Sequence, residues 1–391
     1  MSMFRHAAPT TAAAGTILIA AGGTGGHVLP ARVVAERLTE AGHPAAIVSD
    51  RRAHRHWGAL AARLDNALVL ESGHMTGHPG RRLLAMARVL ANARRVARWM
   101  KTRDVRLVVG FGGYPSMPAL IAARRLGIPF MLHEQNAVMG RVQRWFARDA
   151  DAIALGFPDT ARLPAAARAR AEVTGTPLRA DVLAAAHEMT NDHREGRADR
   201  LRLLICGGSL GARVFGERLP AALARLDEDL AHRLDITHQT PAGEEGIVAA
   251  RYREYGLAAE TAAFFPDLAR RMAAADLIIA RAGGGTLAEI AAIGRASILV
   301  PLPIAADDHQ AANALHFARA GAARVFAQEA FTSEVAAHAL ARLLADDRER
   351  STMAAAARSL ARPHADETVV AMIERLLDRS GEDDGAGEVA R

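Results

Sequence analysis

Three glycine-rich segments combine residue types and spacing that suit the binding of a phosphate. Each follows a short apolar run and precedes a longer amphipathic run: Gly22–His27, Gly207–Gly211 and Gly283–Glu289. A strand that turns tightly into a helix leaves backbone N–H groups unpaired at the helix N-terminus, where the helix dipole also favours negative charge. Each segment is therefore predicted to form a loop that binds an anionic or oxygen-rich ligand.

Polar side chains within these loops extend the same chemistry. Ser209 and Thr286 can donate to phosphate oxygens, and Glu289, one turn into the third helix, can accept from the two hydroxyls of a ribose. A capping or solvated helix carboxylate is the competing interpretation of Glu289. His27 ends the first loop, where an imidazole can take a proton from a reacting hydroxyl. Capping of the loop, or packing against a second domain, is the alternative role for this histidine.

Two other classes of nucleotide-binding protein fit these loops less well. Lys101 is the only lysine and follows no glycine loop, so a Walker-type phosphate loop is excluded. A dinucleotide fingerprint needs a third glycine where Val28 stands, although Asp50 ends the second apolar run as a ribose-binding acid would. The hypothesis of an NAD-dependent oxidoreductase is therefore weakened, but it stays an alternative.

The alternation of short apolar runs with helix-like segments begins at Thr16 and begins again at Leu201. This pattern predicts parallel strands with helices on both faces of each sheet. At 391 residues the chain also exceeds the size of one ordinary core. The predicted fold class is therefore α/β, with two doubly wound, Rossmann-like domains that face a cleft.

The composition of connecting and terminal segments sets the expected domain boundaries. Residues 1–15 are expected to form a flexible N-terminus and residues 16–180 the first domain. Residues 181–200 lack apolar periodicity and predict a linker. Residues 201–379 form the expected second domain, whose last helix can pack back on the first. Residues 380–391 are acidic and glycine-rich, which predicts a disordered tail.

Six motifs occur together in the order in which one enzyme family carries them. They are Gly22–His27, Gly110–Pro115, His133–Asn136, Gly207–Ser209, Gly283–Glu289 and Asp307–Gln310. With these motifs the chain, from about Ile17 to about Asp366, resembles the N-acetylglucosaminyltransferases of glycosyltransferase family 28 that act on the lipid-linked precursor of bacterial cell wall. The resemblance implies the two-domain GT-B fold, with an N-terminal acceptor and membrane-facing domain and a C-terminal UDP-sugar-binding domain.

The resemblance also implies the reaction. N-acetylglucosamine would move from UDP-N-acetylglucosamine to undecaprenyl-pyrophosphoryl-muramyl-pentapeptide (lipid I), giving lipid II for peptidoglycan synthesis. Inversion at the anomeric carbon requires a base for the acceptor hydroxyl and stabilisation of the departing pyrophosphate. Helix N-termini can stabilise that charge, so neither a metal nor a cofactor is expected. The acidic run Asp227–Asp229 is predicted to be a solvated helix end rather than a metal site.

The matching motifs supply the expected site residues. The substrate-binding set is Thr24, Gly25, Gly26, Asn136, Arg179, Ser209, Gly284, Gly285, Thr286, Leu287, Glu289 and Gln310. By resemblance, Gln310 would hold the sugar hydroxyls, while Arg179 and Asn136 would reach the donor from the facing side. His27 is the expected base, and Glu134 and Asn136 are rival catalytic groups that the sequence does not rank. Four positions depart from the family pattern: Thr176, Leu210, Ala282 and Gly285. The substrate contacts that the family makes at these positions do not carry over directly.

A basic segment indicates where the protein meets an anionic membrane surface. Between Glu71 and Asp104 there is no acidic residue. Apolar residues fall there at helical spacing beside many arginines: Leu83, Met86, Leu90, Ala97 and Met100. A basic amphipathic helix suits an anionic bilayer, although the same stripe could pack on the sheet of the first domain. We therefore expect a peripheral protein on the cytoplasmic face of the bacterial inner membrane, since no stretch is long and apolar enough to span a bilayer.

Other functions stay open at this point. Another UDP-sugar-dependent GT-B enzyme, such as a glycolipid synthase or an epimerase, is the nearest alternative, and the block His133–Asn136 argues against it. A nucleic-acid-binding protein could use the same arginines. However, a formal charge of +6 spread over this length does not specify nucleic acid, so no nucleic-acid partner is expected.

Overall fold

The computed structural model describes residues 15–58, 60, 67–71, 79–191, 200–208, 211–303 and 305–388. Ser209 and Leu210 of the second glycine loop lie outside the described residues. Most of the expected flexible N-terminus, 1–14, and residues 192–199 of the expected linker also lie outside them.

The first half of the chain forms a seven-stranded parallel sheet. Its strand order is β3-β2-β1-β4-β5-β6-β7. The strands are β1 (Thr16–Ala21), β2 (Ala45–Asp50), β3 (Ala67–Leu70), β4 (Val105–Gly112), β5 (Phe130–Glu134), β6 (Ala152–Leu155) and β7 (Ala171–Val173). The order reverses between β1 and β4, and such a reversal leaves a crevice at the carboxyl ends of the two strands.

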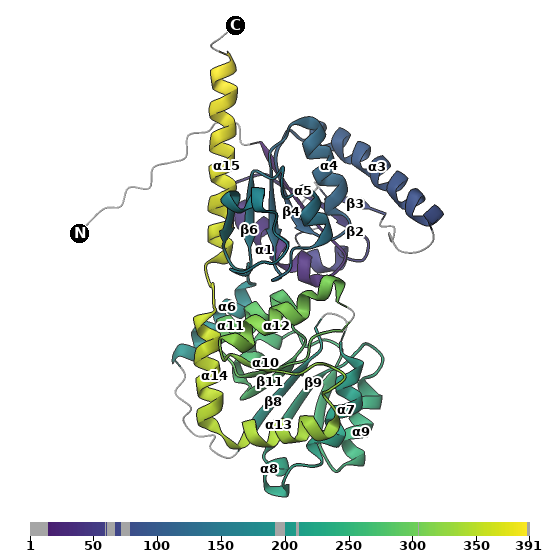
Figure 1. Ribbon diagram of the computed structural model, residues 1–391, viewed down its shortest axis with the longest axis vertical. Coiled ribbons are helices and arrows are strands. Elements are labelled where there is room, and N and C mark those ends of the chain that lie inside the picture. Colours follow the sequence, from purple (N-terminus) through teal and green to yellow (C-terminus); the bar gives the residue numbers. More distant parts are fainter. Residues whose placement is uncertain are drawn as a thin grey trace, which may run out of the picture.

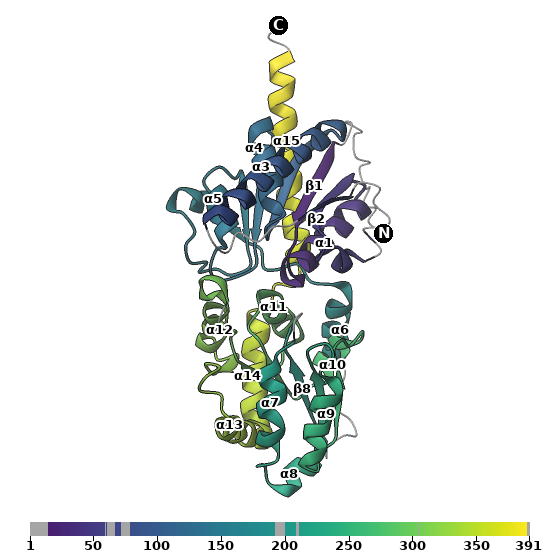
Figure 2. The same cartoon turned by 90° about the vertical axis from the view of Figure 1, so that its right-hand side faces the viewer.

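Helices cover both faces of this sheet (Figures 1 and 2). They are α1 (Gly25–Glu40), η1 (His54–Trp57), α3 (Pro79–Thr102), α4 (Ser116–Leu126), α5 (Arg141–Phe146) and η2 (Ala165–Arg170). The apolar side chains of α3, α4 and α5 pack on one face, and those of α1 pack on the other. Every residue of β1 is buried because it lies between these two layers.

The second half of the chain repeats the plan with a six-stranded parallel sheet, in the order β10-β9-β8-β11-β12-β13. The strands are β8 (Leu201–Cys206), β9 (Leu234–Gln239), β10 (Ala259–Ala262), β11 (Leu277–Ala280), β12 (Ser297–Leu299) and β13 (Ala323–Val325). Here the order reverses between β8 and β11, which are followed by the second and third glycine loops. The predicted fold class is confirmed, and each sheet has its loops at its own crevice.

Two helical layers also cover the second sheet. On one face lie α7 (Arg213–Leu223), α9 (Glu245–Glu254) and α13 (Ser333–Ala345). On the other lie α6 (Ala180–Asn191), α10 (Leu268–Ala274), α11 (Gly284–Ile293), α12 (His309–Arg319) and α14 (Asp347–Ser359). Two short elements complete this half, α8 (Glu228–His232) and η3 (Ala306–Asp308).

The last helix, α15 (Ala365–Glu388), returns to the first sheet and extends beyond it (Figures 1 and 2). Val369, Met372 and Ile373 are buried among the apolar side chains of β1 and α1. Arg37 of α1 donates to Asp366 at 2.8 Å, which fixes the start of α15. The chain therefore crosses between the two halves twice, before α6 and before α15.

Three local expectations differ from the structure. Residues 180–191 form α6 instead of an irregular linker, because Val182 and Ala185 give the segment a buried face against α10 and α11. Small alanines made that periodicity hard to recognise in the sequence. The segment after residue 380 was expected to be disordered, yet α15 continues to Glu388. The acidic run Asp227–Asp229 begins α8 instead of ending a helix.

Candidate active site

The first glycine loop lies against the loop that follows β4, residues 113–115, where the strand order reverses. Ala21 at the end of β1 is paired with Gly112 at the end of β4. A Cβ atom on Gly22 would lie 2.3 Å from Pro115, and one on Gly113 would lie 2.3 Å from the carbonyl oxygen of Gly22. Because a side chain at either position would collide with the other loop, both glycines are required for this close approach.

His27 stands beside this pair of loops, in the first turn of α1. A Cβ atom on Gly112 would lie 2.8 Å from the His27 ring. Nδ1 of His27 lies 3.3 Å from Oγ1 of Thr24. Burial, together with the nearby His309 of the other half, lowers the pKa of His27 to about 4. The imidazole is therefore uncharged near neutrality and able to accept a proton. Thr24, Gly25 and His27 lie together at the start of α1, and their contact with substrates stays a prediction.

Asp50 supports the first glycine loop instead of offering a free carboxylate. Its Oδ2 accepts from the backbone N–H of Gly23 at 3.1 Å, and its Oδ1 accepts from that of Ala53 at 2.8 Å. The side chain is also buried. A ribose-binding acid needs a carboxylate facing the ligand, so this arrangement argues against the oxidoreductase alternative.

Glu134 organises the loop that follows β5. Its Oε1 accepts from the backbone N–H of Asn136 at 2.9 Å and from the side-chain Nδ2 at 3.1 Å, while its Oε2 accepts from the N–H of Gly140 at 2.7 Å. Burial raises the pKa of this carboxyl to about 7 although these bonds oppose the shift. Only 2% of the residue is exposed. These contacts give Glu134 a supporting role and leave Asn136 as the rival group nearer the other half of the molecule.

The loop carrying Asn136 lies directly against the N-terminus of α11. A Cβ atom on Gly284 would lie 2.1 Å from the carbonyl oxygen of Gln135 and 3.3 Å from Oδ1 of Asn136. Glycine at 284 therefore allows the acceptor-side loop to reach the third glycine loop. This contact brings residues that are far apart in the chain to one place.

Arg179 and Glu289 also lie close together, with Glu289 in the second turn of α11. Nη2 of Arg179 lies 3.4 Å from Oε1 of Glu289, and Nη1 donates to Asp181 at 2.8 Å. Burial raises the pKa of Glu289, although Arg179 acts in the opposite direction. Thr286 and Gly285 are half-buried in the same turn. The predicted nucleotide-side residues are thus neighbours, and Glu289 is paired rather than freely solvated.

Two predicted binding residues are constrained by their own half of the molecule. Leu287 is fully buried, and its N–H donates to the carbonyl oxygen of Gly283 at 3.0 Å. The side chain of Leu287 is therefore part of the core, and a substrate contact at this position stays a prediction. Oε1 of Gln310 accepts from the N–H of Leu302 at 3.0 Å, so Nε2 is the group that this amide can offer to a sugar.

A carboxylate before α12 joins the two halves through arginines. Asp307 pairs with Arg162 at 2.5 Å, Arg144 at 2.7 Å and Arg141 at 3.5 Å. Burial raises its pKa, but the arginines outweigh that effect and the pKa is lowered overall. Asp307 and the next residue have φ values of 55° and 56°, a conformation that is costly for non-glycine residues. The ion pairs hold this strained turn at the interface.

Two other residues near the site escaped the sequence analysis. Arg281 donates to the carbonyl oxygens of Val300 and Pro301 at 2.9 and 3.1 Å, so it supports the loop that leads to α12. Phe264, in the loop after β10, is 74% exposed at the carboxyl edge of the second sheet. An exposed ring at this edge can stack on a planar base. No sequence pattern distinguishes these residues from ordinary core or surface positions.

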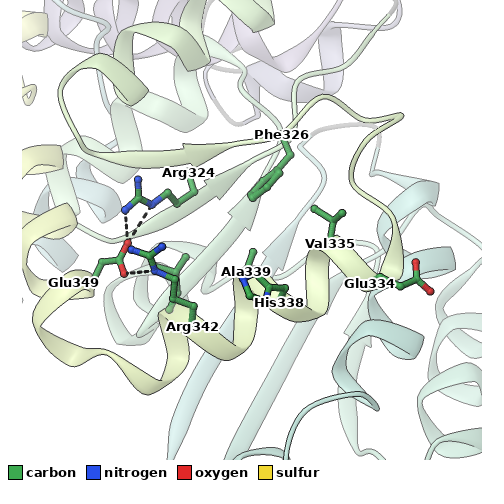
Figure 3. A pocket seen from close by; sticks show the side chains of 9 residues that line it. Arg324, Phe326, Glu334, Val335, His338, Ala339, Arg342 and Glu349 are labelled. Atoms are coloured by element: carbon green, nitrogen blue, oxygen red, sulfur yellow. Dashed lines mark hydrogen bonds and ion pairs between the residues drawn. The ribbon is translucent and has the colours of Figure 1, made fainter.

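The structure also has a cavity away from these loops (Figure 3). It lies on the second half beside β13 and α13 and measures about 370 Å³. Nε of Arg324 donates to Glu349 at 3.1 Å at its rim, and Phe326 and Val335 line it. None of the predicted site residues contributes to its wall. Within the described residues no cluster of three or more histidine, cysteine, aspartate or glutamate side chains suits a metal ion.

Two doubly wound domains with glycine loops facing one another define the GT-B class of glycosyltransferases. Residues 17–155 match the glycosyltransferase family 28 N-terminal domain, and residues 202–369 match the glycosyltransferase family 28 C-terminal domain. The chain therefore belongs to glycosyltransferase family 28.

Curated relatives of similar length resemble this chain in sequence. The chain is 42% identical over 371 residues to the UDP-N-acetylglucosamine--N-acetylmuramyl-(pentapeptide) pyrophosphoryl-undecaprenol N-acetylglucosamine transferase of Maricaulis maris, covering 92% of this chain and 97% of that protein. It is 40% identical to the protein of the same name from Rhizobium meliloti, covering 94% and 96%.

Solved structures agree with this assignment. The crystal structure of Acinetobacter baumannii MurG is similar with a TM-score of 0.74 and 32% identity, covering 92% of this chain and 99% of that one. A putative UDP-N-acetylglucosamine 2-epimerase from Listeria monocytogenes has a TM-score of 0.63 at 12% identity, covering 93% and 97%. At that identity the second likeness shows the shared fold alone.

Proposed function

We propose that this chain transfers N-acetylglucosamine from UDP-N-acetylglucosamine to undecaprenyl-pyrophosphoryl-N-acetylmuramyl-pentapeptide, which gives lipid II for peptidoglycan synthesis. The observation that carries the proposal is the contact of the Gln135–Asn136 loop with Gly284 at the N-terminus of α11. This contact supports the proposal because the loop expected to bind the acceptor then lies beside a helix N-terminus that can bind a pyrophosphate. The relatives that match over more than nine-tenths of their length carry this activity in their names.

The donor side of the site is the N-terminus of α11 and its surroundings. The first backbone N–H groups of a helix have no partner within the helix, so those after Gly283 can bind the pyrophosphate as its charge grows. The hydroxyl of Thr286 can add a further donor. Glu289 supplies the acceptor for the ribose hydroxyls, and the exposed ring of Phe264 offers a stacking surface for uracil.

The acceptor side lies at the crevice between β1 and β4. There the acceptor hydroxyl gives its proton to the neutral imidazole of His27 while its oxygen bonds to the anomeric carbon. The bond from that carbon to the pyrophosphate oxygen breaks, and UDP leaves with the electron pair. Asn136, held by Glu134 at 3.1 Å, is placed to orient the sugars between the two sides.

A transfer assay with a soluble short-chain lipid I analogue tests the proposal directly. Formation of the disaccharide product with release of UDP is the expected result. Two outcomes would contradict it: no transfer to this acceptor, or conversion of UDP-N-acetylglucosamine to its epimer without an acceptor. The second outcome would favour the alternative activity carried by proteins of the same fold.

Chelation is expected to leave transfer essentially unchanged. Because backbone N–H groups and Arg179 meet the charge of the leaving group, EDTA should change the rate by less than about two-fold. The measurement is the initial rate in EDTA against the rate with added magnesium or manganese. Loss of activity in EDTA that either ion restores would assign the leaving-group chemistry to a cation.

The two faces of α3 support a proposal for the membrane-facing surface. The buried face of this helix, Ala85, Val89, Val96 and Met100, packs on the first sheet, so the predicted stripe is divided: Met100 is a core residue and Ala97 packs against the core. Met86 and Leu84 are instead 36% and 53% exposed. Exposed arginines lie along the same helix: Arg88, Arg94, Arg95 and Arg98. The side chain of Leu83, also in the predicted stripe, lies outside the described residues.

This exposed apolar and basic surface supports a proposal for location. We infer that α3 holds the protein on the cytoplasmic face of the inner membrane as a peripheral protein, since each basic residue near an anionic bilayer contributes about 1 kcal/mol. None of the helices in the described part of the chain has the length and apolarity needed to cross a bilayer.

Charge reversal on α3 is expected to release the protein from membranes. Replacing Arg88, Arg95 and Arg98 by glutamate turns attraction into repulsion at an anionic surface. Co-sedimentation with anionic vesicles should be lost, while transfer to a soluble short-chain acceptor should continue at the wild-type rate.

A matched variant separates surface location from net charge. Arg225, Arg253 and Arg348 are exposed on the second half of the chain, and their replacement by glutamate makes the same change in net charge. This control should still bind vesicles. Equal binding by both variants would assign α3 a purely structural role.

A further inference from the structure

Asn313 of α12 connects the two halves of the molecule through its side-chain amide. Its Oδ1 accepts from the backbone N–H of Ala137 at 2.7 Å. Its Nδ2 donates to Oδ1 of Asn136 at 3.0 Å and to the carbonyl oxygen of Ala282 at 2.9 Å. The residue is fully buried. One amide therefore bonds to the acceptor-side loop and to the turn that begins the third glycine loop.

These bonds fix the orientation of the Asn136 amide. Nδ2 of Asn136 donates to Glu134 at 3.1 Å, and its Oδ1 accepts from Asn313. An amide rotated by half a turn would place like groups against both partners. Asn136 therefore has one defined orientation, in which its second N–H is the donor available to a ligand.

The other partner of Asn313 lies on the donor side. Ala282 immediately precedes Gly283–Gly285, the turn whose N–H groups face the pyrophosphate in the proposed function. The contact of Gly284 with Gln135 sets how close the two segments come. The Asn313 amide fixes where the loop lies along the turn, because all three of its hydrogen bonds form only in one relative position of the two segments.

We propose that Asn313 is a positioning residue for transfer, which aligns Asn136 with the helix terminus that receives the leaving group. The proposal rests on the proposed function and names a residue that touches neither reacting group. Thr286, Glu289 and the N–H groups at the start of α11, which are proposed to bind UDP, lie within the second half. Loss of Asn313 should therefore affect the rate of transfer much more than the affinity for the nucleotide.

The test compares Asn313→Ala and Asn313→Asp with wild type. Alanine removes all three bonds; aspartate keeps the bond from Ala137 but sets an oxygen against two oxygens. Both variants should lower kcat about 30-fold or more, a range typical for misplacement of a group that orients substrates. KM for UDP-N-acetylglucosamine and the Kd for UDP should stay within about three-fold.

His316 supplies the matched control on the same helix. Its ring meets Phe157 of the first half at 5.2 Å, so it also joins the two halves but bonds to neither loop. His316→Gln should keep kcat within about two-fold of wild type. If it lowers kcat as much as the Asn313 variants do, the effect belongs to general contact between the halves and the proposal is wrong.

Two further measurements keep the inference testable apart from the function. In a double-mutant cycle, Asn313→Ala combined with Asn136→Ala should be little worse than the more damaging single change, and additive losses would overturn the coupling. Small-angle scattering should show Asn313→Ala to be more extended than wild type, and an unchanged radius of gyration would count against the alignment. Absence of transfer by wild type would overturn the proposed function, whereas normal transfer by the Asn313 variants would overturn only this inference.

Discussion

Replacing His27 with glutamine is expected to lower kcat for transfer by about 100-fold or more, as is typical when a general base is removed. Glutamine retains polarity and can bond to Thr24 but cannot take a proton near neutrality. KM for UDP-N-acetylglucosamine should change little because His27 belongs to the acceptor side. Steady-state kinetics with the short-chain acceptor provide the measurement, and His338→Gln in the distant cavity of Figure 3 is the control.

The pH dependence of wild type gives this prediction a second test. The pKa of His27 is lowered from its ordinary value of 6.5 to about 4. The neutral form, the one that can act as the proposed base, therefore persists above about pH 4, and kcat/KM should fall only as the pH drops through that value. A fall centred near pH 6.5 would show that burial does not act on the catalytic imidazole as the geometry indicates.

The same shift affects stability with a defined sign. Between pH 6.5 and about 4 the unfolded chain binds a proton at His27 that the folded chain does not. Stability is therefore lost as the pH falls through this window, and His27→Gln should reduce that loss. His133, whose pKa burial also lowers to about 4, contributes in the same direction and should remain in the variant. Denaturant unfolding at pH 7 and pH 5 measures the difference.

An unchanged kcat in His27→Gln would remove the base from this position. His27 would then only stabilise the first glycine loop, the alternative that its 3.3 Å contact with the hydroxyl of Thr24 also permits. Asn136 cannot serve as a base because an amide does not titrate near neutrality. Glu134 would be the next candidate, although three N–H groups already occupy its oxygens.

Replacing Glu289 with alanine is expected to raise KM for UDP-N-acetylglucosamine by about 5- to 150-fold. Loss of a charged acceptor for two ribose hydroxyls costs about 1 to 3 kcal/mol, and the change also leaves Arg179 without this partner. KM for the acceptor should stay near its wild-type value. Glu289→Gln should fall between alanine and wild type, because it keeps one acceptor oxygen but not the charge.

A surface carboxylate provides the comparison for Glu289. Glu334 pairs with Arg225 at 2.9 Å in an exposed setting, so Glu334→Ala should leave both KM values unchanged. Burial raises the pKa of Glu289. As the pH falls, this carboxylate should therefore be protonated, and donor binding by wild type should weaken, at a higher pH than for an ordinary carboxylate. An unchanged donor KM in Glu289→Ala would leave this carboxylate with a structural role beside Arg179.

The sequence by itself determined the fold class and the location of the loops. Strand, turn and helix are local properties, and the glycines at 22–26 and 283–285 mark the turns between them. The family motifs added the order of the loops along the chain. These features can be predicted from the sequence because each depends on residues that are close together in the chain.

Tertiary structure decided which polar groups support the site and which face it. Asp50 and Glu134 both end strands beside a loop, and only the folded chain shows that backbone N–H groups occupy their oxygens. Likewise, the predicted apolar stripe on α3 combines residues of two faces: packing on the sheet buries Met100 with Val89 and leaves Met86 exposed. Hydrogen-bond partners and buried faces depend on contacts between distant segments.

Asn313 shows the same limit most clearly. It lies 177 positions from Asn136 and 31 from Ala282, and no local pattern marks it apart from any other helical asparagine. Its importance arises because the acceptor-side loop and the donor-side turn approach within hydrogen-bonding distance at its amide. A sequence gives the chemical groups that a chain can offer, whereas the partners of a buried amide are set only when the two halves of the molecule come together.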